Sequence, residues 1–167
     1  MHIRPFSPED ITTLLVIYND VIATSTAIYL DEPISQIELQ DWVDTRLSKN
    51  YPVLVAILNN TVVGFSSFGD WRAKPGYRFT VEHTVHIARE KRGHGIGGAL
   101  LEALFPFART LNKHVMLGVV DADNIGSLRF HERYGFTEVA RFPQVGFKFN
   151  RWLDAVFMQK FLNGAPE

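Results

Sequence analysis

Apolar residues that recur every three or four positions predict two helices in the first third of the chain. The first helix begins at Ser7, which is a good capping residue, and has Pro8 at its first helical position. It runs to about Ile22, and the mixed residues 23–33 then form a loop. The second helix begins at Ser35, with Glu38 in the capping-box position. We expect four apolar side chains to form its buried stripe: Ile37, Trp42, Val43 and Leu47.

Short apolar runs rich in β-branched residues predict about seven strands. They span residues 2–4, 52–58, 61–68, a stretch that begins at Thr80, and residues 115–120, 136–140 and 155–161. Asn59 and Asn60 form a tight turn between the second and third strands. Residues 69–77 form a loop, and residues 141–153 form either a long loop or a hairpin.

The stretch 80–101 joins a strand, a glycine-rich turn and a helix, and the rest of the chain is arranged around it. Pro106 interrupts the helical pattern that follows, so a bend is expected there. The apolar face of this helix is predicted to contain Ile96, Leu100, Ala103, Leu104, Phe107 and Leu111. A fourth helix opens at Asn124 and ends at Gly135, a residue suited to the left-handed position after a helix.

The order of these elements predicts an α/β (α+β) fold. Early strands follow one another, which favours antiparallel hairpins, and later strands alternate with helices, which requires at least one parallel crossover. We therefore expect a mixed, mostly antiparallel sheet of about seven strands flanked by about four helices, in a single domain that spans residues 1–167.

A strand that ends in a glycine-rich loop and opens a helix forms an anion cradle, because free backbone N–H groups and the helix dipole point at the same place. The cradle predicts a phosphorylated cofactor. Gly93, Gly95 and Gly98 match the dinucleotide fingerprint, and Asp121 lies roughly where a ribose-binding acid would stand. Only one or two strand–helix units follow, however, and two cations precede the loop, which favours a ligand with several phosphates.

Composition narrows the possibilities further. The chain has 167 residues, 46% hydrophobic and 21% charged, which suits a globular protein with a real core. A net charge of -1 provides no field that would favour nucleic acid or an acidic membrane. The absence of cysteine excludes disulfides, thiol catalysis and cysteine-bound metals. The first ten residues contain no apolar signal-peptide core and no apolar run reaches membrane-spanning length, so we expect a cytoplasmic protein.

Three motifs in a fixed order resemble the GCN5-related N-acetyltransferase (GNAT) superfamily. They are Arg92-x-x-Gly95-x-Gly97, Asn124-x-x-Ser127 and His131-Glu132-x-x-Gly135-Phe136. Further stretches are similar to the phosphinothricin and methionine sulfoximine N-acetyltransferase branch: residues 69–72, 80–85, 113–116, 128–131 and 143–154. The resemblance extends over nearly the whole chain.

The resemblance implies acetyl-CoA as the acyl donor. The six histidines show no metal-ligand spacing, so we expect no metal. The residues expected to hold the pyrophosphate of acetyl-CoA are Arg92, Gly93, His94, Gly95, Ile96, Gly97 and Gly98. Val85, His86 and Ile87 are expected to offer backbone groups to the pantetheine arm, and a backbone amide there would polarise the thioester carbonyl. Asn124 and Ser127 are further cofactor candidates, although Asn124 could equally be a plain helix cap. The family also suggests a homodimer.

Acetyl transfer to an amine requires a base, because an α-amine is mostly protonated at neutral pH. The resemblance assigns this role to Glu82. His131 stands where most of the superfamily has tyrosine, and it is left open as acid, base or substrate contact. The acceptor is expected to be a small amino acid or analogue whose carboxylate binds Arg72. The other substrate-site candidates are Ala73, Lys74, His83 and Thr84, although strand alternation favours a packing role for His83 on the face opposite Glu82.

Two other functions fit parts of the sequence. The glycine fingerprint alone fits a dinucleotide-binding oxidoreductase. A family member that has lost activity would bind CoA as a sensor or structural module, and the presence of Glu82 and His131 argues against that alternative.

Overall fold

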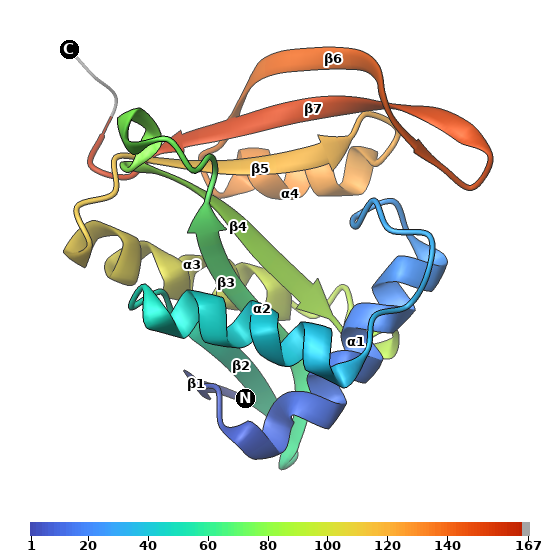
Figure 1. Cartoon of the computed structure of the whole chain (residues 1–167), viewed down its shortest axis with the longest axis vertical. Helices are drawn as coiled ribbons and strands as arrows, with labels where there is room; N and C mark the ends of the chain where they lie inside the picture. The colour runs from blue at the N-terminus through green and yellow to red at the C-terminus, as the bar shows by residue number, and fades with distance from the viewer. Residues whose placement is uncertain (165–167) are drawn as a thin grey trace.

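The computed structural model describes residues 1–164, and its seven strands form one sheet in the order β1-β2-β3-β4-β5-β7-β6 (Figure 1). The pair β4–β5 is parallel and all other neighbouring pairs are antiparallel. The predicted mixed, mostly antiparallel sheet with a parallel crossover is therefore confirmed.

The strands are β1 (His2–Pro5), β2 (Val53–Leu58), β3 (Thr61–Asp70), β4 (Thr80–Ile87), β5 (Val115–Asp121), β6 (Thr137–Lys148) and β7 (Arg151–Phe161). The helices are α1 (Ile11–Thr24), α2 (Gln36–Ser48), α3 (Ile96–Thr110) and α4 (Ile125–Arg133). Short 3₁₀ turns occupy Pro8–Asp10, Pro75–Tyr77 and Arg89–Lys91.

The helices cover both faces of the sheet. Figure 1 shows α2 in front of β2 and β3, with α3 behind them. Leu14 of α1 and Leu39 of α2 pack with Phe65 in the core of the first face. Leu100 and Leu104 of α3 belong to the larger core of the second face. Apolar residues therefore fill two layers, one on each side of the strands.

The N-terminal half of the fold differs from the sequence prediction in detail. The chain makes one 3₁₀ turn after Ser7 before α1 begins at Ile11. Ser35 caps α2 as predicted, and its Oγ accepts a hydrogen bond from the backbone amide of Glu38 at 3.3 Å.

The predicted buried stripe of α2 is partly wrong. Ile37 and Leu47 are exposed, whereas Leu39 and Val43 are fully buried. The period of 3.6 residues explains the difference, because positions 39, 43 and 46 lie on one side of a helix. The inward position in the last turn is therefore taken by Arg46 rather than by Leu47.

The apolar face of α3 is also wider than predicted. Phe107 is exposed, whereas Leu101, Phe105 and Ala108 are buried beside Leu100 and Leu104. Adjacent positions can both be buried here because α3 shares one broad core with residues of β2, β3, β4, β5 and β7. The helix continues through Pro106 to Thr110, and the bend expected there stays a prediction.

Residues 141–153 form a hairpin rather than a loop. β6 continues to Lys148, and Phe149 and Asn150 make the turn with φ of 50° and 57°. β7 starts at Arg151, four residues earlier than the predicted strand. β3 likewise continues to Asp70, into the predicted loop.

The long hairpin holds the loop that follows α1. The side chain of Lys148 is fully buried, and its Nζ donates hydrogen bonds to the carbonyl oxygens of Ile22, Ser25 and Ile28 at 2.6, 2.8 and 2.6 Å. One ammonium group thus satisfies three backbone acceptors that lie more than a hundred residues away in sequence.

Replacing Lys148 by Met should lower the free energy of unfolding by about 3 kcal/mol, because one buried and two part-buried carbonyls lose their donor. Urea titration measures this change. The matched control is Lys74→Met on the exposed loop, which should change stability by less than about 0.5 kcal/mol. Equal effects of the two substitutions would show that the Lys148 hydrogen bonds contribute little.

Candidate active site

The sheet opens between its two central strands. β4 and β5 pair at only three positions, Thr80 with Val115, Val81 with Met116 and Glu82 with Leu117. Beyond Glu82, β4 continues alongside β3, whereas β5 follows β7 as far as Asp121. Figure 1 shows the two strands diverging. A gap between strand edges results, and within the described part of the chain no strand pairs with the β4 edge that lines it.

The backbone of β4 offers hydrogen-bonding groups to this gap. The amide of Ala88 donates to Val63 of β3 at 2.9 Å, and Thr80 accepts from Trp71 at 3.4 Å. Because antiparallel partners alternate, the even-numbered residues of β4 direct their backbone groups to β3. Val85 and Ile87 therefore direct theirs into the gap, whereas those of His86 are turned toward β3.

The gap ends at the glycine-rich loop. Gly93 and Gly95 have φ of +81° and +78°, and a Cβ built at either would have no heavy atom within 4 Å. The loop and the gap together form a cleft of about 630 Å³. The cleft is lined here by Lys91, Arg92, Gly93, Gly95, Ile96, Gly97 and Gly98. Open backbone, two cations and the start of α3 suit a group with several phosphates.

Two candidate cofactor residues have local partners. His94, whose ring nitrogen Nδ1 lies 2.8 Å from the carbonyl of Arg92, lines a separate surface hollow beside Met1. Asn124 borders the cleft and caps α4, since its Oδ1 accepts a hydrogen bond from the amide of Ser127 at 3.0 Å. The sequence left these two roles of Asn124 open, and the structure shows the cap.

Asp121 is engaged in contacts that argue against a ribose-binding role. Its Oδ2 accepts from Thr26 at 2.7 Å and from Arg151 at 3.1 Å. The carboxylate thus links β5 to the loop after α1 and to β7. Asp121 is therefore not available as the ribose-binding acid that a dinucleotide site requires.

His131 and His83 meet on the α3 and α4 side of the cleft. The two Nε2 atoms lie 3.0 Å apart, and Nδ1 of His131 lies 2.7 Å from the carbonyl of Ser127. Gly118 of β5 makes room for them, because a Cβ there would lie 2.6 Å from His131 Nε2 and 2.7 Å from His83 Nε2. Burial lowers the pKa of both imidazoles, that of His83 well below its usual range.

Glu82 lies on the opposite face of the sheet, as strand alternation predicts. Burial raises the pKa of its carboxyl group, and the nearby charge of Arg46 lowers it. Arg46 packs over Trp42 with its Cζ 3.6 Å from the ring centroid. One guanidinium nitrogen lies 3.3 Å from a Cβ built at Gly69, which pairs with Glu82 across the strands. Gly69 therefore leaves the space that the guanidinium fills beside Glu82.

Arg46 is a component of the site that the sequence pattern did not indicate. The available signal was its helical spacing of three residues from Val43, which places it on the buried side of α2. Its pKa is lowered to about 10 by burial, so it keeps its charge at neutral pH.

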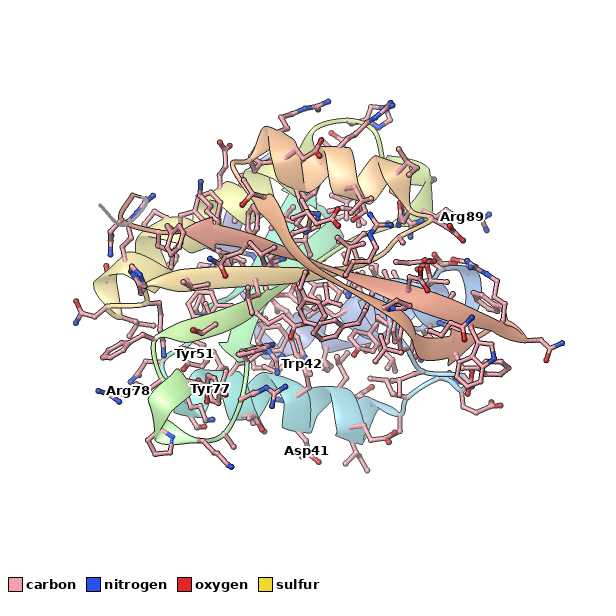
Figure 2. All side chains as sticks on the ribbon, turned by 90° about the horizontal axis from the view of Figure 1, so that it is seen from above. Asp41, Trp42, Tyr51, Tyr77, Arg78 and Arg89 are labelled. Atoms are coloured by element: carbon pink, nitrogen blue, oxygen red, sulfur yellow. The ribbon has the colours of Figure 1, made fainter. Side chains whose placement is uncertain are left out.

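The predicted acceptor residues do not all come together. Arg72, Ala73 and Lys74 are exposed, and Arg72 lies over Trp71 with its Cζ 4.8 Å from the ring centroid. Figure 2 shows Tyr77 and Arg78 of this loop at one end of the molecule and Arg89, just after β4, at the other. The loop and the glycine cradle thus stand at opposite ends of β4. Thr84 lies between them on the Glu82 face.

His86 packs among aromatic rings on the same face. Its ring centroid lies 5.8 Å from that of Tyr18 and 5.5 Å from that of Phe65. Burial lowers its pKa from 6.5 to about 4, so the imidazole is neutral at physiological pH. This environment gives the side chain a structural part, next to a strand edge that faces the cleft.

Replacing His86 by Phe should reduce the loss of stability in acid. As pH falls below 6.5 the unfolded chain takes up a proton at His86, whereas the folded chain does so only near pH 4. The wild-type free energy of unfolding therefore falls over that interval, by roughly 3 kcal/mol from this residue. Urea titrations at pH 7 and pH 4 measure the difference. An equal fall in the variant would mean that His86 titrates normally.

Comparison with known proteins shows which family this architecture belongs to. The model of the acetyltransferase (GNAT) family matches residues 14–136. An L-methionine sulfoximine/L-methionine sulfone acetyltransferase of Pseudomonas aeruginosa is 43% identical over 158 residues, which cover 94% of this chain and 92% of that protein. A phosphinothricin N-acetyltransferase of Alcaligenes faecalis is 32% identical, with 96% and 82% covered.

A solved structure agrees with the sequence comparison. An acetyltransferase from Salmonella typhimurium, determined with its cofactor acetyl-CoA, superposes with a TM-score of 0.93 at 41% identity and covers 96% of this chain and 93% of that one. The fold and the strand-edge cleft are those of an acyl-group transferase. The chain belongs to the GNAT family of N-acetyltransferases.

Two further properties bear on function. No group of three or more metal-ligating side chains occurs among residues 1–164. In the same part of the chain, none of the helices combines the length and the apolar character that crossing a bilayer demands.

Proposed function

We propose that the chain, acting as a single domain, transfers the acetyl group of acetyl-CoA to the α-amine of a small amino acid or analogue. Methionine sulfoximine, methionine sulfone and phosphinothricin, the acceptors named for its relatives, define the substrate class. The main support for the proposal is the arrangement of the site along one strand. A single strand, β4, has the glycine cradle at one end and Glu82 near the other, with an unpaired edge between them.

The donor fits the cleft in three parts. Backbone amides from Gly93 to Gly98 and the charge of Arg92 suit the pyrophosphate. The edge groups of Val85 and the amide of Ile87 suit the amides of the pantetheine arm, which would lie as an added strand, whereas the carbonyl of Ile87 already accepts a hydrogen bond from Arg92 Nε at 3.1 Å. Asn124 and Ser127 border the opposite wall. When bound, acetyl-CoA supplies the activated acyl group.

Glu82 acts as the general base. The ammonium group of the acceptor gives one proton to the carboxylate, and its nitrogen then attacks the thioester carbon. The carbon–sulfur bond breaks, the nitrogen loses a second proton and the thiolate gains one. Burial raises the pKa of Glu82 toward the value that an effective base needs, and Arg46 limits the rise.

The acceptor enters beside the loop at residues 71–79. Arg72 binds its carboxylate, with Ala73, Lys74, His83 and Thr84 as the other substrate-site residues. The exposed guanidinium of Arg72, placed over Trp71 and near Tyr77, supports this role, since an anion can approach it from solvent.

We further propose that the protein is a cytoplasmic homodimer. Acetyl-CoA is an intracellular metabolite, which supports the location. The β6–β7 hairpin carries a set of large exposed apolar side chains, a feature typical of interfaces between subunits. They are Val139, Phe142, Val145, Phe147, Phe149 and Trp152.

An assay of thiol release tests the activity. With acetyl-CoA and methionine sulfoximine, methionine sulfone or phosphinothricin, the wild-type protein should release CoA, and Glu82→Gln should lower kcat about 100-fold through loss of the base. Glu102→Gln, on the exposed side of α3, is the matched control and should behave as wild type.

Other outcomes would favour the alternatives. Binding of acetyl-CoA without thiol release to any of these amines would indicate a non-catalytic CoA-binding module. Calorimetric binding of NAD(P) without binding of acetyl-CoA would indicate an oxidoreductase and overturn the proposal.

Replacing Arg46 by Gln should move the acidic limb of the pH profile of kcat/KM to higher pH. The charge of Arg46 lowers the pKa of Glu82, so its removal keeps the carboxyl group protonated up to a higher pH. Arg89→Gln, at the far end of β4, is the control. An acidic limb at the same pH in the Arg46 variant would contradict the electrostatic role of Arg46.

A further inference from the structure

We propose that His83 is a positioning residue that stabilises the Nδ1–H tautomer of His131, by donating a hydrogen bond from its Nε2–H to Nε2 of His131. The hydrogen bond follows from geometry alone. Its consequence for acetyl transfer rests on the function proposed above.

The first of the two contacts that favour this tautomer of His131 comes from its own helix. Nδ1 lies 2.7 Å from the carbonyl oxygen of Ser127, and a carbonyl can only accept. Nδ1 of His131 therefore carries the proton, and in the neutral ring Nε2 is unprotonated and can accept a hydrogen bond. The carbonyl is four residues earlier, so this contact is fixed by the helical turn.

The tautomer of His83 then follows. Its Nε2 lies 3.0 Å from the bare Nε2 of His131, and a hydrogen bond at that distance needs one proton between them. That proton belongs to His83. The other nitrogen, Nδ1 of His83, is buried and has no hydrogen-bond partner among the described residues. The two ring N–H groups thus form one continuous chain of hydrogen bonds, from His83 through His131 to the carbonyl of Ser127.

The surroundings keep the rings in this arrangement. Their centroids lie 5.0 Å apart at an interplanar angle of 30°, and Phe136 presents its ring to both at 5.5 and 5.3 Å. Gly118 closes the other side, where any larger residue would displace both Nε2 atoms. Packing therefore restricts both rings to the geometry in which they meet.

Among residues 1–164, no neighbouring charge favours an additional proton on His83. His86 of the same strand and His131 of α4 are the titratable groups that act on His83, and both oppose its protonation. β5 contributes Gly118 and β3 contributes Phe68 at this level of the sheet. An added proton would have to enter at Nδ1 of His83, in a buried environment. The pair is therefore neutral at physiological pH.

A neutral His131 of this tautomer accepts rather than donates. Its single N–H, at Nδ1, donates a hydrogen bond to the carbonyl of Ser127, and its Nε2 is unprotonated. His131 consequently does not supply the proton that the departing thiolate takes up. The alternative of an imidazolium acid is disfavoured, and activity should not decline as pH rises through the normal range of histidine.

Nitrogen-15 spectra of the histidine side chains in the whole protein test the assignment. At pH 7 the wild type should show His131 protonated at Nδ1 only and His83 protonated at Nε2 only. His83→Phe keeps the aromatic contacts but removes the donor, so His131 keeps only its contact with Ser127 and its Nδ1–H population should fall. His83→Gln can donate from its amide and should restore the Nδ1–H form. His114→Phe, which changes a histidine outside the site, should leave both signals unchanged.

Kinetics give a second readout. His83→Phe should lower kcat about 10-fold, with KM for acetyl-CoA changed less than about twofold, because orientation rather than binding is lost. His83→Gln should recover most of kcat. A His131 ring that is charged at pH 7, or bare at Nδ1, would overturn the proposal, as would a Gln variant that remains as slow as the Phe variant. Correct tautomers without thiol release would support the hydrogen bond and overturn the proposed function.

Discussion

The short contact between β4 and β5 is the constraint on which the rest of the molecule depends. Three residue pairs join the strands, and each strand then follows a different neighbour. Unpaired backbone N–H and C=O groups on a strand edge can form hydrogen bonds with another extended chain. Here the free edge lies inside the fold and is flanked by the glycine cradle, so a pantetheine arm is the extended segment that fits it.

The same contact distributes the chemistry over two faces. Glu82 is the last residue of β4 that pairs with β5, and His83 is the first that does not. Alternation directs Glu82 toward α2 and Arg46, and His83 toward α4 and His131. The gap passes between these two groups of side chains. An acyl donor in the gap would therefore have the proposed base on one side and the histidine pair on the other.

Local features of the fold could be predicted from the sequence because their causes are local. The turn at Asn59 and Asn60, the Ser35 cap, the Gly135 helix end and the glycine cradle all follow from short-range chemistry. The boundaries of β6 and β7 could not, since their extension depends on pairing with each other. The motif order was sufficient to indicate the family, which the comparisons show.

Contacts between distant segments were not predictable in the same way. Arg46 reaches Glu82 only because α2 crosses the end of β3, and Lys148 reaches three carbonyls that lie more than a hundred residues away in sequence. The His83–His131 contact needs Gly118 on a third strand. Strand alternation correctly separated Glu82 from His83, but the partner on the far face depended on how α4 packs. The spacing of residues along the sequence does not predict such contacts between distant segments.

The central claim is that the unpaired edge of β4 holds the acyl donor and places it between Glu82 and the histidine pair. A crystal structure with CoA and methionine sulfoximine tests this claim most directly. We expect the pantetheine amides to form hydrogen bonds with the backbone of Val85 and Ile87, with the acceptor amine within hydrogen-bonding distance of Glu82. A pantetheine arm outside the β4–β5 gap, or an amine bound away from Glu82, would contradict it.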